Sequence, residues 1–208
     1  MATLLHVDAS VDVQASNTRR MSSSFVERWA AANPQATILR RDLASDPPPA
    51  LNETFVRAVK TAPEARSPAE RDAWRVSQAL SDEFLAADRY VVGMPMHILT
   101  VPSPFKAYVE QIFHEGRVFA RTDRGFEGRL NGRRFLFLVS KGADYRPGAP
   151  LAAFDMLEPY LIKLLTFCGV AETDITFVSV NDALAPGGPS PADAASAASR
   201  IQRLAASW

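Results

Sequence analysis

Tyr90-Val91-Val92-Gly93-Met94-Pro95-Met96 is an apolar run that stops at a glycine and a proline. A short loop over His97–Val101 follows, and Pro102-Ser103-Pro104 then opens an amphipathic stretch. Strands buried in parallel sheets are short and nearly continuous apolar runs. The pattern therefore predicts a strand, a loop and a helix in succession. In open α/β sheets, ligands bind beside loops of this kind, at the carboxyl ends of the strands.

Strand and helix patterns alternate along the rest of the chain. Further strands are expected over Leu4–Val7, Ala36–Leu39, Phe135–Val139 and Ile175–Val180. Helical spacing of apolar residues appears over Met21–Trp29, Ser67–Ala87, Phe105–Phe113, Phe154–Cys168 and Pro191–Ala206. This alternation predicts one three-layer α/β domain over residues 1–208, with a doubly wound parallel sheet and right-handed crossovers. Five strands suit the flavodoxin-like order 2-1-3-4-5. Loops are expected over Ala44–Asn52, Arg117–Asn131 and Asp182–Ser190.

Composition narrows the function classes. The 208 residues include 23 basic and 23 acidic side chains, so no net charge favours nucleic acid or an anionic membrane surface as a partner. The single Cys168 excludes an internal disulfide, and three scattered histidines predict no metal site. No apolar stretch approaches the roughly 20 residues of a membrane span, and the N-terminus lacks a basic leader. We expect a cytoplasmic protein.

A hydroxyl-rich turn follows the first predicted strand. Four of its residues carry hydrogen-bonding side chains: Ser10, Ser16, Asn17 and Thr18. A helix N-terminus adds free N–H groups and partial positive charge, so this turn is suited to a phosphate, with Arg19 or Arg20 supplying a full charge. An ordinary N-cap of the first helix explains the same residues. The glycine patterns of NTPases and dinucleotide-binding folds are absent from the turn.

Several motifs occur in a fixed order along the chain. They are Ser10 with Ser16-Asn17-Thr18, Pro95-Met96 with Leu99 and Val101-Pro102, Phe105-Lys106-Ala107-Tyr108, Phe119 with Gly125 and Gly128, Ser140-Lys141-Gly142-Ala143, and Phe167 before Gly169. In order and spacing, this set resembles the FMN-dependent NADH-azoreductase and quinone reductase family over nearly the whole length. The resemblance implies a flavodoxin-like fold.

The resemblance also implies a role for each loop. The first loop, with Ser10, Ser16, Asn17 and Thr18, would hold the FMN phosphate. The second, with Met96, His97, Ile98 and Leu99, would wrap the isoalloxazine ring, and the third, with Ser140, Lys141, Gly142 and Ala143, would lie near the other edge of the ring. From their residue types, Phe119, Tyr145 and Phe167 are candidates for an aromatic pocket that binds planar substrates; packing in the core or in a dimer explains them equally.

This chain departs from the family's usual residues at three places. His97-Ile98 replaces Tyr-Asn, Val11-Asp12 replaces Pro-Arg, and Ala143 replaces a glycine. Ile98 lacks the hydrogen-bonding side chain of asparagine, and Asp12 repels a phosphate unless it points away. His97 and Lys141 are the side chains expected to place a donor or cation near the reduced ring. The alternatives are an exposed loop histidine and a solvated lysine that uses only its backbone N–H. Hydride transfer needs no catalytic acid or base, so none is assigned.

The resemblance implies an FMN-dependent oxidoreductase that passes two electrons from NADH or NADPH to quinones or azo compounds by a ping-pong mechanism. It also implies a homodimer with the flavin at the interface. Ile98 and Asp12 leave open an alternative, a flavodoxin-like module with weakened or lost FMN binding and no reductase activity. A flavodoxin-type electron carrier is the third hypothesis; the extra segment Arg117–Asn131 argues against it, because a carrier needs only the minimal sheet.

Overall fold

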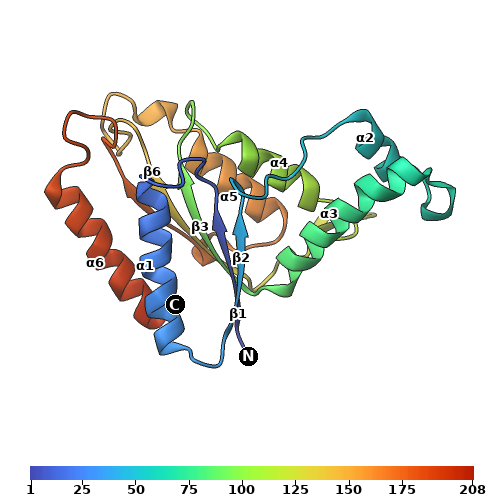
Figure 1. Ribbon diagram of the computed structural model, residues 1–208, viewed down its shortest axis with the longest axis horizontal. Coiled ribbons are helices and arrows are strands. Elements are labelled where there is room, and N and C mark those ends of the chain that lie inside the picture. Colours follow the sequence, from blue (N-terminus) through green and yellow to red (C-terminus); the bar gives the residue numbers. More distant parts are fainter.

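The computed structural model describes residues 1–208 and is built on a five-stranded parallel sheet (Figure 1). Its strands are β1 (Thr3–Asp8), β2 (Thr37–Asp42), β3 (Arg89–Pro95), β6 (Arg134–Ser140) and β7 (Ile175–Val180). They lie in the order β2-β1-β3-β6-β7, with all four pairings parallel. Counted along the chain, this is the order 2-1-3-4-5 that the sequence predicts, so the predicted fold class is confirmed.

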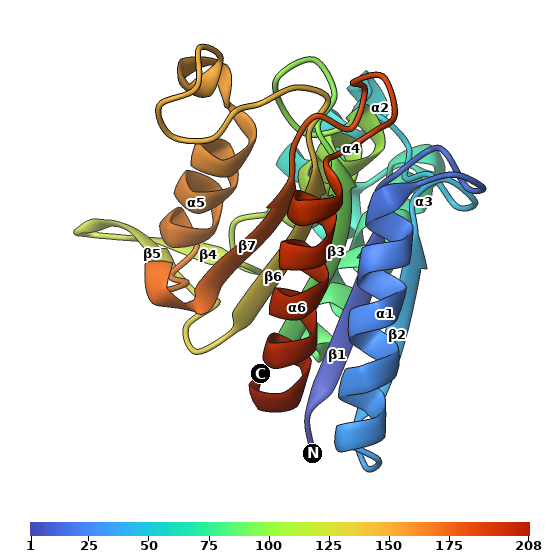
Figure 2. The same ribbon diagram turned by 90° about the vertical axis from the view of Figure 1, so that its left-hand side faces the viewer.

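Helices cover both faces of the sheet. On one face, α1 (Asn17–Ala32) and α6 (Pro191–Ser207) lie side by side (Figure 2). The other face is covered by α3 (Pro68–Ala86), α4 (Ser103–Ile112) and α5 (Leu157–Phe167). A shorter helix, α2 (Glu53–Lys60), packs against α3 and extends away from the sheet with it (Figure 1). None of these helices is long and apolar enough to cross a membrane.

Two apolar clusters lie between these layers. The rings of Tyr90 and Phe135 stack at 4.2 Å in the cluster beneath α3, α4 and α5. Phe25 and Trp29 of α1 pack in the cluster on the opposite face. Gly93 allows α1 to approach β3 closely, because a Cβ there would lie 2.9 Å from Asp8 Oδ1 and from Ser22 Oγ. Burial on both faces explains why the central strands are continuous apolar runs.

The structure corrects two expectations about local structure and adds one helix that the sequence did not predict. Residues 117–131, expected to be a loop, contain an antiparallel hairpin of β4 (Phe119–Thr122) and β5 (Gly125–Gly128). The hairpin's backbone packs against the end of α5, where a Cβ on Gly128 would lie 2.0 Å from the Cys168 carbonyl carbon. Helix α2 was not expected, because its eight residues are too few for a clear period. Helix α5 begins at Leu157, and Phe154 belongs to a separate 3-10 turn over Ala152–Phe154.

Other local expectations are confirmed. The segments expected as loops over 44–52 and 182–190 contain no helix or strand. Helix α3 begins with a capping box, in which Ser67 accepts from the Glu70 N–H while the Glu70 carboxylate accepts from the Ser67 N–H. Short 3-10 turns also occur over Pro63–Ala65 and Glu172–Asp174.

Candidate functional site

A crevice of about 330 Å³ lies beyond the carboxyl ends of the strands. It is lined by segments that follow β1, β3, β6 and β7. Eight of the residues expected at a site line it together: Ser10, Ser16, Asn17, Thr18, Met96, His97, Ser140 and Gly142. The hydroxyl-rich turn over Ser10–Thr18, which we call the phosphate turn, is about 80 residues from the loop after β3 in the sequence. The two segments nevertheless face the same crevice.

The N-terminus of α1 offers several donors to this crevice. The N–H groups of Asn17 and Thr18 have no partner in the chain, as is usual for the first turn of a helix. Ser16 caps the helix by accepting from the Arg19 N–H at 3.3 Å, and its hydroxyl also lies 3.0 Å from Thr18 Oγ1. The N-cap alternative is therefore correct, and it leaves the same hydroxyls on the wall of the crevice. Unpaired N–H groups at a helix N-terminus favour an anion.

Asp12 holds the phosphate turn in shape. Its Oδ1 accepts from the Gln14 N–H at 3.0 Å and from the Ala15 N–H at 2.8 Å. The Ser10 hydroxyl donates to the Asp12 carbonyl at 3.4 Å. Asp12 also lines the crevice, but these two backbone donors stabilise its carboxylate within the turn.

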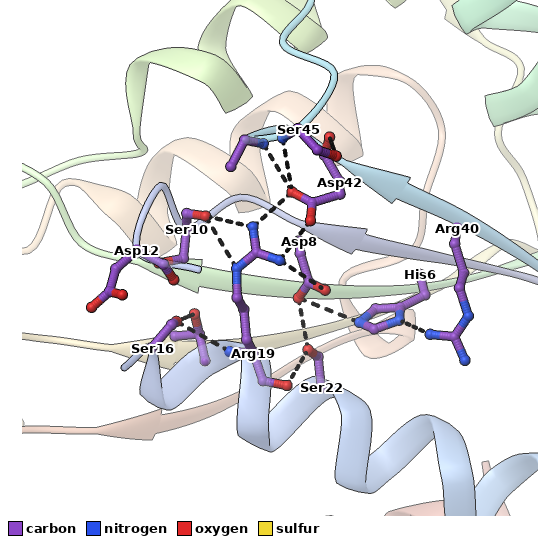
Figure 3. Close-up of polar contacts among 12 residues, drawn as sticks. His6, Asp8, Ser10, Asp12, Ser16, Arg19, Ser22, Arg40, Asp42 and Ser45 are labelled. Atoms are coloured by element: carbon purple, nitrogen blue, oxygen red, sulfur yellow. Dashed lines mark hydrogen bonds and ion pairs between the residues drawn. The ribbon is translucent and has the colours of Figure 1, made fainter. Parts of the chain in front are cut away.

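The two arginines do not supply the full charge expected in the crevice. Arg19 donates to both carboxylate oxygens of Asp42, at 2.7 and 2.6 Å, and does not line the crevice (Figure 3). This hydrogen bond raises the pKa of Arg19 and lowers the pKa of Asp42 to about 2. Arg20 donates to the carbonyl of Ala15 at 3.2 Å and to the side-chain oxygen of Asn17, and it does not line the crevice either.

The loop after β3 contains a tight turn. His97 and Thr100 exchange two backbone hydrogen bonds at 2.9 and 3.1 Å. The residues between them have positive φ, 43° for Ile98 and 70° for Leu99, as in a type I′ turn. Neither of their N–H groups has a partner in the chain. Neither residue lines the crevice; Ile98 borders an adjoining surface groove together with His97.

Lys141 differs from both sequence expectations. Its side chain is 5% exposed, and its Nζ donates to Asp155 at 2.5 Å and to Glu158 at 2.6 Å. Its backbone N–H donates within the sheet, to the Val180 carbonyl at 2.8 Å. Lys141, Asp155 and Glu158 line a hollow that is separate from the crevice, where the two carboxylates pair with the buried ammonium group. The lysine is therefore neither a cation at the crevice nor a solvated residue.

The three residues expected to bind substrate do not line the crevice. Phe119 and Phe167 pack against each other at 5.2 Å, and Phe126 completes this cluster. Phe167 ends α5, and the β4–β5 hairpin that carries Phe119 and Phe126 lies beside that end of the helix (Figure 2). The crevice instead lies beyond the carboxyl ends of the sheet strands. Tyr145 borders the hollow that contains Lys141. Ala143 of the loop after β6 does not line the crevice either.

The sequence did not predict that the segment after β7 lines the crevice. Ala183 and Leu184 line the crevice, and their N–H groups donate to the carbonyls of Lys141 and Gly142 at 3.0 and 3.1 Å. The strand order could have indicated this segment, because the carboxyl ends of all parallel strands lie at the same edge of the sheet. Four other lining residues were not assigned to the site: Val11, Asp12, Ala15 and Pro95.

Comparison with known proteins matches residues 2–205 to a family described by a flavodoxin-like fold. The FMN-dependent NADH:quinone oxidoreductase of Nostoc punctiforme is 39% identical over 208 residues and is covered completely, as is this chain. The corresponding protein of Frankia casuarinae is 36% identical over 93% of this chain and 90% of its own length.

Solved structures show the same fold. The azoreductase AzrA aligns with a TM-score of 0.90 at 22% identity, covering all of both chains. An FMN-dependent NADH-azoreductase from Bacillus anthracis, solved in complex with FMN, aligns with a TM-score of 0.89 at 22% identity over 99% of this chain and 98% of its own. At these identities the two structures support the fold alone.

Proposed function

Because the chain belongs to the family with the flavodoxin-like fold, we propose that it is an FMN-dependent oxidoreductase that transfers two electrons from NADH or NADPH to quinones or azo compounds. The observation that carries this proposal is the shared crevice. Unpaired helix N–H groups and buried hydroxyls lie at the phosphate turn, and the Met96–His97 segment lines the same space. The full-length relative at 39% identity is named for the same activity.

The lining residues fit FMN. At the phosphate turn, the N–H groups of Asn17 and Thr18 and the hydroxyls of Ser10, Ser16 and Thr18 would hold the phosphate. The one carboxylate among the lining residues belongs to Asp12, which already accepts two backbone N–H groups. These donors match the acceptor oxygens of a phosphate and would be costly to bury against an apolar ligand.

The remaining walls fit the flat ring system. Pro95, Met96 and Leu184 supply apolar surface, and Gly142 carries no side chain. The Gly142 N–H, which has no partner in the chain, is a donor in the wall formed by the loop after β6. Bound FMN would supply a ring that exchanges a hydride or electrons, a chemistry for which amino-acid side chains have no equivalent.

His97 is the side chain we propose as the donor nearest the ring. Apart from Asp12, it is the one titratable residue among those lining the crevice. Its backbone is fixed by the two hydrogen bonds with Thr100. Two side chains were expected to serve as this donor, His97 and Lys141. Because Asp155 and Glu158 bind the Lys141 ammonium group, His97 is the remaining candidate.

We further propose that the protein is a homodimer with the flavin site at the interface. Large apolar side chains are exposed beside the crevice, with Ile98 92% and Leu184 87% exposed. Phe126 and Phe167 form a second exposed apolar cluster. Exposed apolar patches of this kind mark interaction surfaces. Light scattering of the purified protein tests this assignment, and a monomer at micromolar concentration would contradict it.

We also propose a cytoplasmic location, supported by the single buried Cys168, and one domain over residues 1–208. Fractionation of the source cells tests the location, and limited proteolysis tests the domain assignment.

Absorbance spectroscopy tests the enzyme assignment. We expect the purified protein to take up FMN, to lose the oxidised flavin spectrum when NADH or NADPH is added, and to regain it when a quinone follows. Parallel lines in an initial-rate analysis would support ping-pong kinetics. Flavin that neither nucleotide reduces would indicate an electron carrier. A protein that takes up no FMN would indicate the non-catalytic module that Asp12 and Ile98 suggest.

A further inference from the structure

Arg19 is the centre of a charged network behind the phosphate turn (Figure 3). Its Nη1 and Nη2 donate to the carboxylate of Asp42 at 2.7 and 2.6 Å. Its Nε and Nη2 also donate to the carbonyl oxygen of Ser10 at 3.3 and 2.7 Å. The Asp8 carboxylate lies 3.8 Å from Nη1. The side chain is 13% exposed, so these contacts are shielded from most of the solvent.

Both carboxylates in this network are anchored to other elements. Asp42 ends β2, and its Oδ1 accepts from the Ala44 N–H at 2.9 Å. Asp8 ends β1, and its Oδ1 accepts from the Ser22 hydroxyl of α1 at 2.8 Å. Arg19 therefore connects the turn after β1 to the end of β2 and to α1.

The contact with Ser10 occupies one backbone carbonyl oxygen of the turn. A carbonyl oxygen carries partial negative charge and repels an anion, whereas N–H and O–H groups attract one. The Ser10 carbonyl oxygen is held by Arg19, while the side chains of Ser10, Ser16 and Thr18 line the crevice. The guanidinium itself does not line the crevice, and the carboxylates of Asp42 and Asp8 more than offset its single positive charge.

We propose that Arg19, held by Asp42, is a positioning residue that shapes the turn for the phosphate group of the flavin and is not the counter-ion of that phosphate. This inference rests on the proposed FMN site. The ligand it concerns is a phosphate monoester carried on a flavin, held by neutral donors. Riboflavin has the same ring system without the phosphate, so the affinity ratio of FMN to riboflavin measures this role separately from general loss of structure.

Two substitutions distinguish positioning from direct charge pairing. Asp42→Asn removes a negative charge near the turn and weakens the clamp on Arg19. A counter-ion role predicts that FMN then binds equally or more tightly, whereas a positioning role predicts weaker binding. Arg19→Lys keeps the charge but loses the planar fork that contacts Ser10 and Asp42 together. A counter-ion role predicts retained affinity, and a positioning role predicts a loss.

The neighbouring ion pair supplies a matched control. Arg41 precedes Asp42 in β2 and donates to both carboxylate oxygens of Glu83, at 2.9 and 2.7 Å. Neither residue of this pair lines the crevice. Glu83→Gln therefore repeats the loss of one carboxylate charge from a bidentate arginine pair, without touching the phosphate turn.

The experiment titrates apoprotein with FMN and with riboflavin, following the quenching of flavin fluorescence. For Asp42→Asn and Arg19→Lys we expect about tenfold weaker FMN binding, because donors to a charged oxygen are displaced, with riboflavin affinity retained. Glu83→Gln should bind both flavins like the wild type. Unchanged or tighter FMN binding in both variants would overturn the inference, as would equal losses for FMN and riboflavin. A wild-type protein that binds neither flavin would instead overturn the proposed function.

Discussion

The backbone N–H of Met156 donates to the carbonyl oxygen of Leu99 at 3.0 Å. This bond joins the loop after β3 to the segment that leads into α5. Leu99 is one of two consecutive residues with positive φ, and the other is Ile98. The tertiary contact thus helps to hold a turn conformation that neither residue prefers by itself.

Replacing Ile98 should stabilise the protein. Within a single chain, Ile98 is 92% exposed and has a φ of 43°, so it adds little to the packing of its own chain while its branched side chain opposes the backbone conformation. Asparagine tolerates this region, and relief of the strain is worth about 1 kcal/mol, or roughly 2–4 °C in Tm for a chain of this size. Thermal unfolding of Ile98→Asn and of the control Ile98→Ala, which keeps the Cβ, measures the effect. A lower Tm for Ile98→Asn would contradict the prediction.

Removing the two hydroxyls of the α1 N-terminus should weaken FMN binding. Each of Ser16→Ala and Thr18→Ala should lose about 1–3 kcal/mol of binding free energy, since each hydroxyl would donate to a charged oxygen. Ser16 is also an N-cap, whose loss lowers stability by about 1 kcal/mol. Ser190 caps α6 in the same way and does not line the crevice, so Ser190→Ala controls for the loss of a cap. Isothermal titration with FMN gives the affinities. Unchanged affinity in the double variant would show that this turn does not bind the FMN phosphate.

Lys141 should matter for stability and little for the flavin. Lys141→Met leaves Asp155 and Glu158 together without their cation, which should lower the free energy of unfolding by about 3–5 kcal/mol. Adding Glu158→Gln should recover part of the loss. Because Lys141 does not line the crevice, the reduction potential of bound FMN should stay close to the wild-type value. Denaturant unfolding measures the loss of stability, and a redox titration measures the reduction potential. A clear change in potential with little loss of stability would indicate that Lys141 belongs to the flavin site.

The ion pair of Arg19 and Asp42 should make the free energy of unfolding depend on pH in the acidic range. The Arg19 hydrogen bond lowers the pKa of Asp42 to about 2, from 3.8 in the absence of partners. The unfolded chain therefore binds the proton first, so this contribution is complete above about pH 4 and is lost as the pH falls toward 2. The difference in unfolding free energy between the wild type and Asp42→Asn should shrink over that range. Urea unfolding at pH 6, 4 and 3 measures it; a difference independent of pH would contradict the assignment.

The sheet was predictable because its signals are local. Strands buried on both faces appear as apolar runs, as in Tyr90–Gly93, and serine caps such as Ser67 mark where helices begin. The hairpin was not predictable, because its strands have only four residues each and pack against the end of α5, a distant part of the chain. The crevice was partly predictable, since loops that follow parallel strands meet at one edge.

By itself, the sequence determined the order of the five sheet strands and of the helices α1, α3, α4, α5 and α6. It also determined the hydroxyl-bearing turn of Ser10, Ser16 and Thr18, because periodicity, capping and chain connectivity act over short stretches. Only the tertiary structure decided which charges reach the crevice. Arg19 and Lys141 are each cations beside a predicted binding loop, yet Asp42 holds one, and Asp155 and Glu158 hold the other, from positions 14 or more residues away. The partner of a charge depends on distance in space, and sequence spacing does not encode that distance.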